Sequence, residues 1–384
     1  MAVLWLKSAR RTSCSVTRTR NARATSCKNT SAITTRRCNV KCFYHETQGS
    51  HAPKHFFLRG QPVPSPEQPV RAERLKEAVE AAGASLSLLP LRASEPLLLD
   101  RLKRIHTTRY LDFLEGAVER WRALPAASDV VAPNVHPCGH ASFYPRHIVG
   151  QAGWHMHDMA CPMDEGSYSG ILASATTAQA AADAVLQGEP VSYALCRPPG
   201  HHAGPERAGG FCFLNNTALA ATVFRERYDR VAIVDVDLHH GNGTQDIFWE
   251  RDDVWTGSVH VDPTDFYPFY WGAAQEVGSG EGKGYNCNVP LPLGSDGIAF
   301  LRALSRLLSA LADFRPQAIV IALGLDAHKD DPLAGMTLET EDFYRIGQRL
   351  AQVKGPKVIV QEGGYPTDSL SDNLAAFLQG FQRG

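Results

Sequence analysis

The amino-acid sequence predicts one large α/β domain in which helices cover a mostly parallel sheet. From residue 42 onward, short apolar runs alternate with longer amphipathic segments, which is the pattern of consecutive strand and helix units. Several of the apolar runs end in acidic, histidine or glycine residues, as strands do when a site lies at their carboxyl ends. The composition does not change after residue 42, so residues 41–384 are expected to form a single domain.

The apolar and amphipathic segments predict five strands and seven helices. Strands are expected at 192–196, 230–235, 256–261, 318–323 and 357–361. Helices are expected at 71–82, 108–122, 170–187, 215–227, 298–313, 340–353 and 369–382. Residues 47–69 and 128–153 contain several prolines and are predicted to be long loops. Loops this long in a compact domain are more often functional than idle.

Charge and hydropathy exclude some classes of protein. No apolar run approaches the roughly 18 to 20 residues that span a bilayer, so a membrane protein is not expected. Residues 1–41 hold ten Lys or Arg and no acid, whereas the rest of the chain holds 29 bases and all 40 acids, a net charge of −11. An acidic body disfavours nucleic acid as the main partner and suits a cationic substrate. Nine cysteines without a CxxC pair suit a reducing compartment, and a cytoplasmic location is expected.

The basic leader, residues 1–40, is left out of the fold prediction. It is rich in Arg, Ser and Thr and lacks the continuous apolar stretch of a secretory signal. Three interpretations remain: an organelle transit peptide, a disordered arm that binds nucleic acid, or a non-native extension before an alternative start at Val40. The third is favoured over organelle targeting, because the domain pattern begins at 41–44. The leader is therefore expected to be disordered or non-native.

The most informative segment is a buried strand that runs directly into acids, histidines and glycines at 235–243. Alternation along an extended chain places Asp235, Asp237 and His239 on one face. A second apolar run at 318–323 delivers Asp326 at its own carboxyl end. Burying these carboxylates without compensation would be very costly, so a bound cation is expected. Asp237, His239 and Asp326 make one nitrogen and two oxygen ligands and leave a position for water, which is the layout of a catalytic zinc site.

Two further strand ends carry groups suited to proton transfer and to oxyanion stabilisation. A Pro/Gly-constrained turn after 192–196 carries His201 and His202, and histidine is the side chain best matched to proton transfer near neutral pH. Tyr365 follows two glycines after 357–361, where its phenol could donate a hydrogen bond to a developing oxyanion. Each motif alone has an ordinary explanation as a turn or a cap. Four strand ends with complementary chemistry at one edge of a sheet favour an active site.

Three motifs resemble those of the histone deacetylase superfamily and, within it, the bacterial acetylpolyamine amidohydrolases. They are Arg197-Pro-Pro-Gly-His-His-Ala-Gly204, Asp235-Val-Asp-Leu-His-His-Gly-Asn-Gly-Thr244 and Glu362-Gly-Gly-Tyr365, and the resemblance extends over residues 42–384. The resemblance implies an arginase-like three-layer fold with a central, mostly parallel sheet of about eight strands flanked by helices. It also implies zinc, or alternatively ferrous iron, on the three ligands named above. The histidine pair would act on water and leaving group, without either histidine being assigned as base or acid, and the tyrosine would polarise the acetyl carbonyl.

The resemblance implies further groups around this site. Asp235 would orient His201 and, with groups at Ser258 and Val259 and main-chain oxygens of the metal ligands, would form a K⁺ or Na⁺ site. Asn242 stands where one branch of the family has an aspartate behind the second histidine. The substrate channel would be formed by Phe211, Tyr267 and Gly210. By contrast, Gly241 occupies the position where the ureohydrolases of this fold carry an aspartate for a second metal, so a binuclear manganese enzyme is disfavoured.

Five histidines outside these motifs are expected to be ordinary loop residues. They lie in or beside the predicted loop 128–153 without matching acids, and they are His136, His140, His147, His155 and His157.

Three functions remain in competition: hydrolysis of acetylated polyamines or related small amines, deacetylation of acetyl-lysine in proteins, and non-catalytic binding of acetylated ligands. The third is disfavoured because all ligands, both histidines and the tyrosine are present. Residues 47–69 resemble the loop through which acetylpolyamine amidohydrolases form homodimers with a narrowed entrance. A narrow entrance favours a slim acetylated amine as the substrate, giving free amine and acetate.

Overall fold

The structure is a computed structural model that describes residues 40–90, 96–139 and 141–384. The prediction of a disordered or non-native leader falls outside these residues, except at Val40, and so does the prediction for His140. No helix within the described ranges is long and apolar enough to cross a membrane.

In the described part of the chain, one sheet of eight strands forms the centre of the domain, and every neighbouring pair is parallel. The strand order is β4-β1-β5-β10-β9-β6-β7-β8. The predicted, mostly parallel sheet of about eight strands is confirmed. The strands are β1 (Lys41–Tyr44), β4 (Ser85–Leu88), β5 (Val191–Ala194), β6 (Val231–Asp235), β7 (Val254–Val261), β8 (Asn286–Leu291), β9 (Ala318–Leu323) and β10 (Lys357–Gln361).

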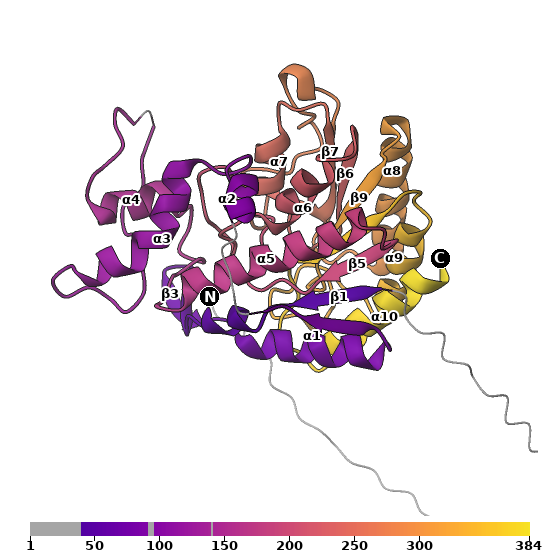
Figure 1. Ribbon diagram of the computed structural model, residues 1–384, viewed down its shortest axis with the longest axis horizontal. Coiled ribbons are helices and arrows are strands. Elements are labelled where there is room, and N and C mark those ends of the chain that lie inside the picture. The colour runs from indigo at the N-terminus through magenta and orange to yellow at the C-terminus, as the bar shows by residue number, and fades with distance from the viewer. Residues whose placement is uncertain (1–39, 91–95, 140) are drawn as a thin grey trace, which may run out of the picture. The chain divides into compact units, whose positions relative to one another are not determined.

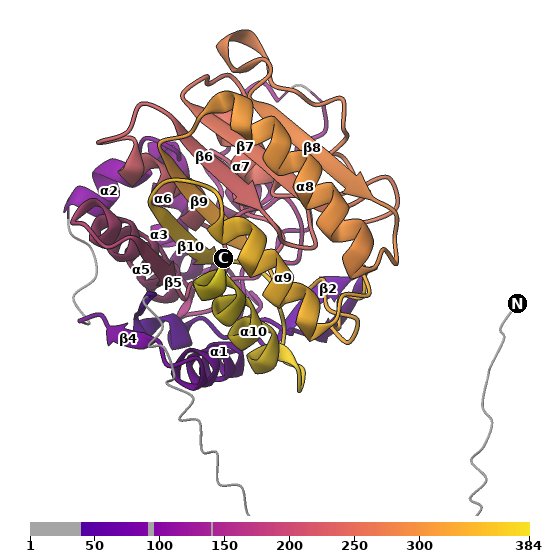
Figure 2. The ribbon, with the colours of Figure 1, turned by 90° about the vertical axis from the view of Figure 1, so that its right-hand side faces the viewer.

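Helices cover both faces of this sheet and complete the three layers (Figures 1 and 2). One face is covered by α1, α8, α9 and α10, and the other by α5 and α6, while α3 and α4 pack farther out on the side of α5. The helices are α1 (Pro69–Ala81), α2 (Pro96–Leu102), α3 (Thr108–Arg122), α4 (Ile148–His155), α5 (Ser167–Leu186), α6 (Asn216–Phe224), α7 (Asn242–Phe248), α8 (Gly297–Phe314), α9 (Thr340–Ala351) and α10 (Leu370–Arg383).

The central strands supply side chains to both hydrophobic cores, as parallel strands buried on two faces do. In β9, Ala318 and Val320 pack into the core beneath α5 and α6, whereas Ile319 and Ile321 pack into the core beneath α8 to α10. This alternation explains why the strand is a continuous apolar run. Each predicted strand and helix overlaps one in the structure.

The prediction of a long loop at 47–69 was wrong. The segment holds a 3₁₀ turn (Glu46–Ser50) and an antiparallel hairpin of β2 (His55–Leu58) and β3 (Gln61–Pro64). Arg59 and Gly60 both have positive φ, as a two-residue hairpin turn requires. The prolines lie in β3, which pairs with β2 on one side only, so no ladder hydrogen bond is lost on its other side.

The prediction of a loop at 128–153 was wrong at its carboxyl end, because α4 begins at Ile148. His147 caps this helix by accepting a hydrogen bond from the amide of Val149 at 3.2 Å.

Candidate active site

The four predicted strand ends lie next to one another at the centre of the sheet. The order β5-β10-β9-β6 places the segments that follow these strands side by side at their carboxyl edge. His201 and His202 follow β5, and Tyr365 follows β10. Asp326 follows β9, and Asp237 and His239 follow β6. Segments separated by up to 164 positions in the sequence are thereby brought into one site.

The three predicted metal ligands form one buried group. Asp237, His239 and Asp326 offer ligand atoms that all lie within 4.8 Å of one another. His239 Nδ1 is 3.0 Å from an oxygen of Asp326 and 3.3 Å from an oxygen of Asp237. The amide of Gly363 donates to Asp237 at 2.7 Å, and the amide of Leu238 donates to Asp326 at 3.1 Å. These main-chain donors fix the carboxylates in place.

Glycine is required where Gly363 passes this group. A Cβ atom there would lie 2.3 Å from Asp326 Oδ2 and 2.6 Å from Asp237 Oδ2. The close approach of the backbone lets the glycine amide reach the carboxylate.

The electrostatics of this group fit a bound cation. Burial acts to lower the pKa of His239, but the carboxylates of Asp237 and Asp326 outweigh it and raise the pKa to about 9. Burial acts to raise the pKa of Asp237, but His201 and His239 outweigh it, and the pKa of this carboxyl is lowered. The buried carboxylates therefore require positive charge between them, which a metal ion on these two oxygens and one nitrogen would supply.

The two adjacent histidines have different partners. His201 Nδ1 lies 2.9 Å from the carboxylate of Asp235, whereas His202 Nδ1 lies 2.7 Å from the side-chain oxygen of Asn242. The ring centroids are 4.1 Å apart. Despite burial, Asp237 and Asp235 raise the pKa of His201 to about 10. Burial, His201 and His239 hold the pKa of His202 well below its usual value.

Glu362 anchors the histidine turn to the tyrosine turn. One of its oxygens accepts from the amides of Gly200 and His201 at 2.6 and 3.0 Å, and the other accepts from the hydroxyl of Thr217 at 2.6 Å. In the sequence, Glu362 stands out only as part of a motif. Its position just before a double glycine gave no indication that it would hold another strand's turn.

Tyr365 is buried at the end of β10 and is held from two sides. Its amide donates to the carboxylate of Asp331 at 3.0 Å. The guanidinium of Arg71 lies 5.3 Å from its ring centroid, and Phe211 makes an edge contact with the same ring at 5.5 Å. Arg71 also donates to the carbonyl oxygens of Gly364, at 2.5 Å, and Glu362. Nothing in the sequence indicates a role for Asp331 or Arg71, because each stands among other charged residues that indicate an exposed segment.

A cavity of about 200 Å³ leads to this group of side chains. The predicted channel residues Phe211, Tyr267 and Gly210 all line it, together with the metal ligands, both histidines and Tyr365. The β2–β3 hairpin also contributes to the wall. Its residues in the cavity are Phe56, Phe57 and Leu58.

Asp158 is a lining acid that the sequence analysis did not single out. Its carboxylate accepts from the hydroxyl of Tyr267 at 2.7 Å and from the amides of Gly210 and Ala160 at 3.1 and 2.9 Å. The channel thus has largely apolar walls with one firmly held negative charge apart from the metal ligands.

The predicted monovalent-cation residues lie on adjacent strands. Asp235 of β6 and Ser258 of β7 are paired in register, and Val259 follows. His260 Nε2 lies 2.9 Å from the carbonyl oxygen of Gly272, so this nitrogen carries the proton and Nδ1 accepts from the Ser258 hydroxyl at 2.7 Å. The hydroxyl oxygen of Ser258 keeps lone pairs for a cation.

The expectation of ordinary loop histidines was wrong for His155, which is a buried residue of α4, and His147 caps the same helix; the histidines that the structure describes bind local partners. His155 contacts the carbonyl oxygen of Glu206 and the hydroxyl of Tyr144, and His136 contacts the carbonyl oxygen of Gly153. His157 packs against Trp271. Within the described ranges, none of them joins a group of three potential metal ligands.

A buried ion cluster beneath the site, the Glu67 cluster, consists of Glu67, Arg71 and Arg197. The Glu67 carboxylate lies 3.2 Å from Arg197 Nε and 3.6 Å from Arg71 Nη1, and all three side chains are essentially inaccessible to solvent. Arg197 also donates to the carbonyl oxygens of Gln48, at 2.6 Å, and His51. The cluster connects the segment before the hairpin, the histidine turn and the tyrosine turn.

Glu67→Gln should lower the free energy of unfolding by about 3 kcal/mol, because removing one partner leaves two buried guanidinium groups without their counter-ion. Denaturant unfolding measures this. Glu73→Gln removes an exposed acid from the same region and should change the value by less than about 0.5 kcal/mol. Equal stability of the two variants would show that the cluster contributes nothing.

An arginase-like α/β fold with a buried metal-ligand group and two histidines at the carboxyl edge of its sheet defines a class of protein, the metal-dependent hydrolases. The comparisons with known proteins narrow this class. The profile of the histone deacetylase domain matches residues 65–381.

Acetylpolyamine amidohydrolase of Burkholderia pseudomallei is 42% identical over 340 residues, covering 88% of this chain and 98% of that protein. Acetylpolyamine amidohydrolase 1 of Pseudomonas aeruginosa is 38% identical over 343 residues, with 88% and 98% covered. A crystal structure of acetylpolyamine aminohydrolase from Burkholderia pseudomallei superposes with a TM-score of 0.85 at 41% identity, with 89% and 98% covered. The chain belongs to the histone deacetylase family, and it is a metal-dependent deacetylase.

Proposed function

We propose that this chain is a zinc-dependent amidohydrolase that removes acetyl groups from acetylated polyamines or related small amines. The observation that carries this proposal is the cavity of about 200 Å³ that leads to the metal-ligand group, with largely apolar walls and the fixed carboxylate of Asp158. Such a cavity suits a slim alkyl chain with a distal ammonium group. The names of the related proteins agree with this substrate class.

The metal would be held by Asp237, His239 and Asp326, with Fe²⁺ as the alternative to Zn²⁺. When bound there, Zn²⁺ supplies Lewis acidity to the acetyl carbonyl and lowers the pKa of water to about 7. A K⁺ or Na⁺ ion beside Asp235 and Ser258 would stabilise the same strand ends.

We assign the proton transfers to His202. Its Nδ1 donates to Asn242 Oδ1, so the neutral ring has its lone pair on Nε2 and can accept the proton of the attacking water. The Tyr365 hydroxyl donates a hydrogen bond to the developing oxyanion. His202 then returns the proton to the departing nitrogen, and amine and acetate leave. His201, held by Asp235, supplies positive charge beside the reacting groups.

We further propose a cytoplasmic homodimer, formed through residues 47–69, that does not act on nucleic acid. Phe57 and Leu58 of the hairpin are 36% and 46% exposed, which suits an apolar contact with a second copy. The acidic body disfavours nucleic acid.

The proposal predicts that acetylated putrescine, cadaverine or spermidine is hydrolysed with kcat/KM at least about tenfold above that of an acetyl-lysine peptide. Tenfold corresponds to about 1.4 kcal/mol of differential transition-state stabilisation. A slim amine enters the cavity, whereas a peptide must place its backbone against the hairpin. Steady-state kinetics with both substrate types measure the ratio.

Two variants test whether the hairpin and Asp158 cause this preference for acetylated polyamines. Shortening the hairpin at 55–64 should reduce the preference by admitting the peptide, and Asp158→Asn should reduce it by raising KM for the polyamine. Equal or better peptide hydrolysis by the intact enzyme would instead identify a protein deacetylase. Binding of acetylated ligands without any hydrolysis would identify a non-catalytic binder.

A further inference from the structure

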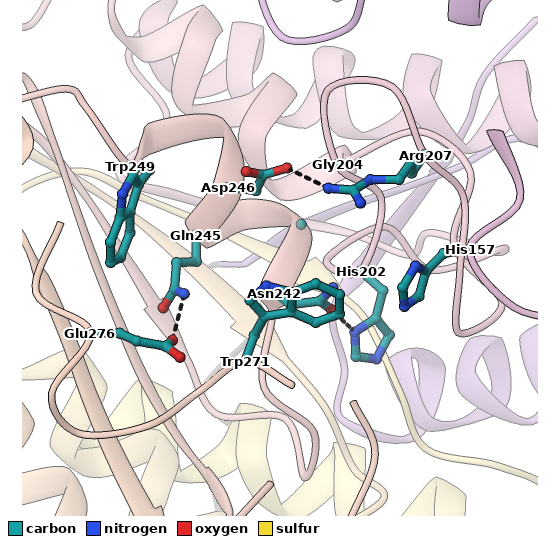
Figure 3. Close-up of a pocket in the computed structure, with 11 residues that line it drawn as sticks. His157, His202, Gly204, Arg207, Asn242, Gln245, Asp246, Trp249, Trp271 and Glu276 are labelled. Carbon is teal, nitrogen blue, oxygen red and sulfur yellow. Dashed lines mark hydrogen bonds and ion pairs between the residues drawn. The ribbon is translucent and has the colours of Figure 1, made fainter. Parts of the chain in front are cut away.

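A second cavity, of about 270 Å³, borders the candidate active site (Figure 3). It lies between α7, the segment at 204–207 and the segment at 271–276. His202 lines both this cavity and the catalytic one, and Asn242, its hydrogen-bond partner, lines the second cavity. Apart from His202 and Asn242, no side chain that lines this cavity takes part in the proposed catalysis.

Aromatic rings form much of the wall of the second cavity. Trp249 and Trp271 both line it, and His157 meets Trp271 edge to face, with ring centroids 5.1 Å apart. Indole faces attract cations, and Trp is the most effective side chain for this interaction.

Two carboxylates, Asp246 and Glu276, line the wall, and Glu276 is held by main-chain and side-chain amides. Glu276 Oε2 accepts from the Gln245 amide at 2.7 Å and from the amide of Gly272 at 2.8 Å. These donors fix the carboxylate at the end of the cavity that Trp249 shares (Figure 3). Among the described residues, no group donates to Glu276 Oε1, which remains available to a ligand.

The charges in the wall favour a positively charged ligand. Glu276 and Asp246 contribute two carboxylates, and Arg207 contributes one cation. Arg207 is about half exposed and already faces Asp246 at 3.5 Å, on the opposite side of the cavity from Glu276 (Figure 3). An anionic ligand would therefore meet Glu276 unopposed, whereas an ammonium group would be paired there.

We propose that the second cavity is a binding site for an organic ammonium ion, with its charge on Glu276 and its alkyl chain against Trp249 and Trp271. The chemistry of the wall alone selects this ligand class. That the natural ligand is the free amine product rests on the proposed function. An occupant also contacts Asn242, which holds His202, so product bound here lowers kcat without raising KM.

The test is equilibrium binding of spermidine to the intact metal-loaded enzyme, followed by calorimetry and by tryptophan fluorescence. Glu276→Gln keeps an acceptor for Gln245 but removes the charge, and it should weaken spermidine binding at least tenfold. Trp249→Phe should reduce the fluorescence change, and the remainder should come from Trp271. Glu281→Gln, which removes an exposed acid farther along the same loop, should leave the affinity within twofold. All three variants should keep the wild-type KM for acetylated substrate.

Product inhibition gives a second readout. Spermidine should lower kcat in the wild-type enzyme and in Glu281→Gln, and this component should disappear in Glu276→Gln. Unchanged affinity in Glu276→Gln would overturn the proposal. Binding that is lost only in Asp158→Asn would also overturn it and would place spermidine in the catalytic cavity. The proposed function is tested separately by turnover: an enzyme that does not hydrolyse acetylpolyamines but binds spermidine through Glu276 would refute the function and keep the second site.

Discussion

Asp237→Ala and Asp326→Ala should each lose the bound metal and the deacetylase activity together. In the proposed site each carboxylate would provide one of three protein ligands, and two remaining ligands cannot hold the ion in an open tetrahedral site. The loss is expected to be close to complete, because only His239 and one carboxylate of the buried group would remain in each variant. Elemental analysis of the purified variants measures the metal, and turnover of an acetylated amine measures the activity.

Asp330→Ala provides the matched control for this pair. Asp330 lies four residues beyond Asp326, and its side chain is 63% exposed. This variant should keep both metal and activity. Stoichiometric metal in both Asp237→Ala and Asp326→Ala would refute the ligand assignment.

Tyr365→Phe should retain the metal but lower kcat by about 10²-fold or more, the usual scale for losing one oxyanion donor. The ring stays in place because Phe211 and Arg71 contact it and because Asp331 binds its main-chain amide. The experiment therefore removes a hydroxyl and little else. Metal content and steady-state kinetics are measured on the same preparation.

Tyr267→Phe removes another hydroxyl from the same cavity. That hydroxyl is bound to Asp158, so its loss should appear mainly in KM and should change kcat by less than about tenfold. If Tyr365→Phe turned over at the wild-type rate, Tyr365 would be only a turn residue.

The centre of the fold and the convergence of the site could be predicted from the sequence. Strands such as β6 and β9 are buried on both faces, so they are continuous apolar runs that stand out against their surroundings. The acids that follow them belong to strands of one parallel sheet, whose carboxyl ends share an edge. The shared edge alone therefore predicts that Asp237 and Asp326 lie close together, as they do in the structure.

The margins of the fold could not be predicted in the same way. Strand β8 contains two asparagines and a proline, and β3 contains two prolines. Neither segment therefore has the amino-acid pattern that predicts a strand. Helix α7 has seven residues with one glycine and no apolar periodicity. These elements are stabilised by tertiary contacts, which local propensity does not reveal.

Buried charged partners were also invisible in the sequence. Glu67 and Arg197 are 130 positions apart and meet only in the folded chain. A Glu within a proline-rich stretch indicates a solvated loop by every local rule. Asp158 and Glu276 were missed for the same reason, because their roles depend on cavities that several distant segments enclose.

The Glu67 cluster links the segment before the hairpin to the turn that carries Tyr365. Arg197 donates hydrogen bonds to the main chain at Gln48 and His51. Arg71 donates to the main chain at Glu362 and Gly364. The carboxylate of Glu67 pairs with both guanidinium groups. The segment before the hairpin and the turn that carries Tyr365 are therefore cross-linked through three buried side chains. We therefore expect the loss of the Glu67 carboxylate to disturb the start of the hairpin and the position of the Tyr365 phenol together.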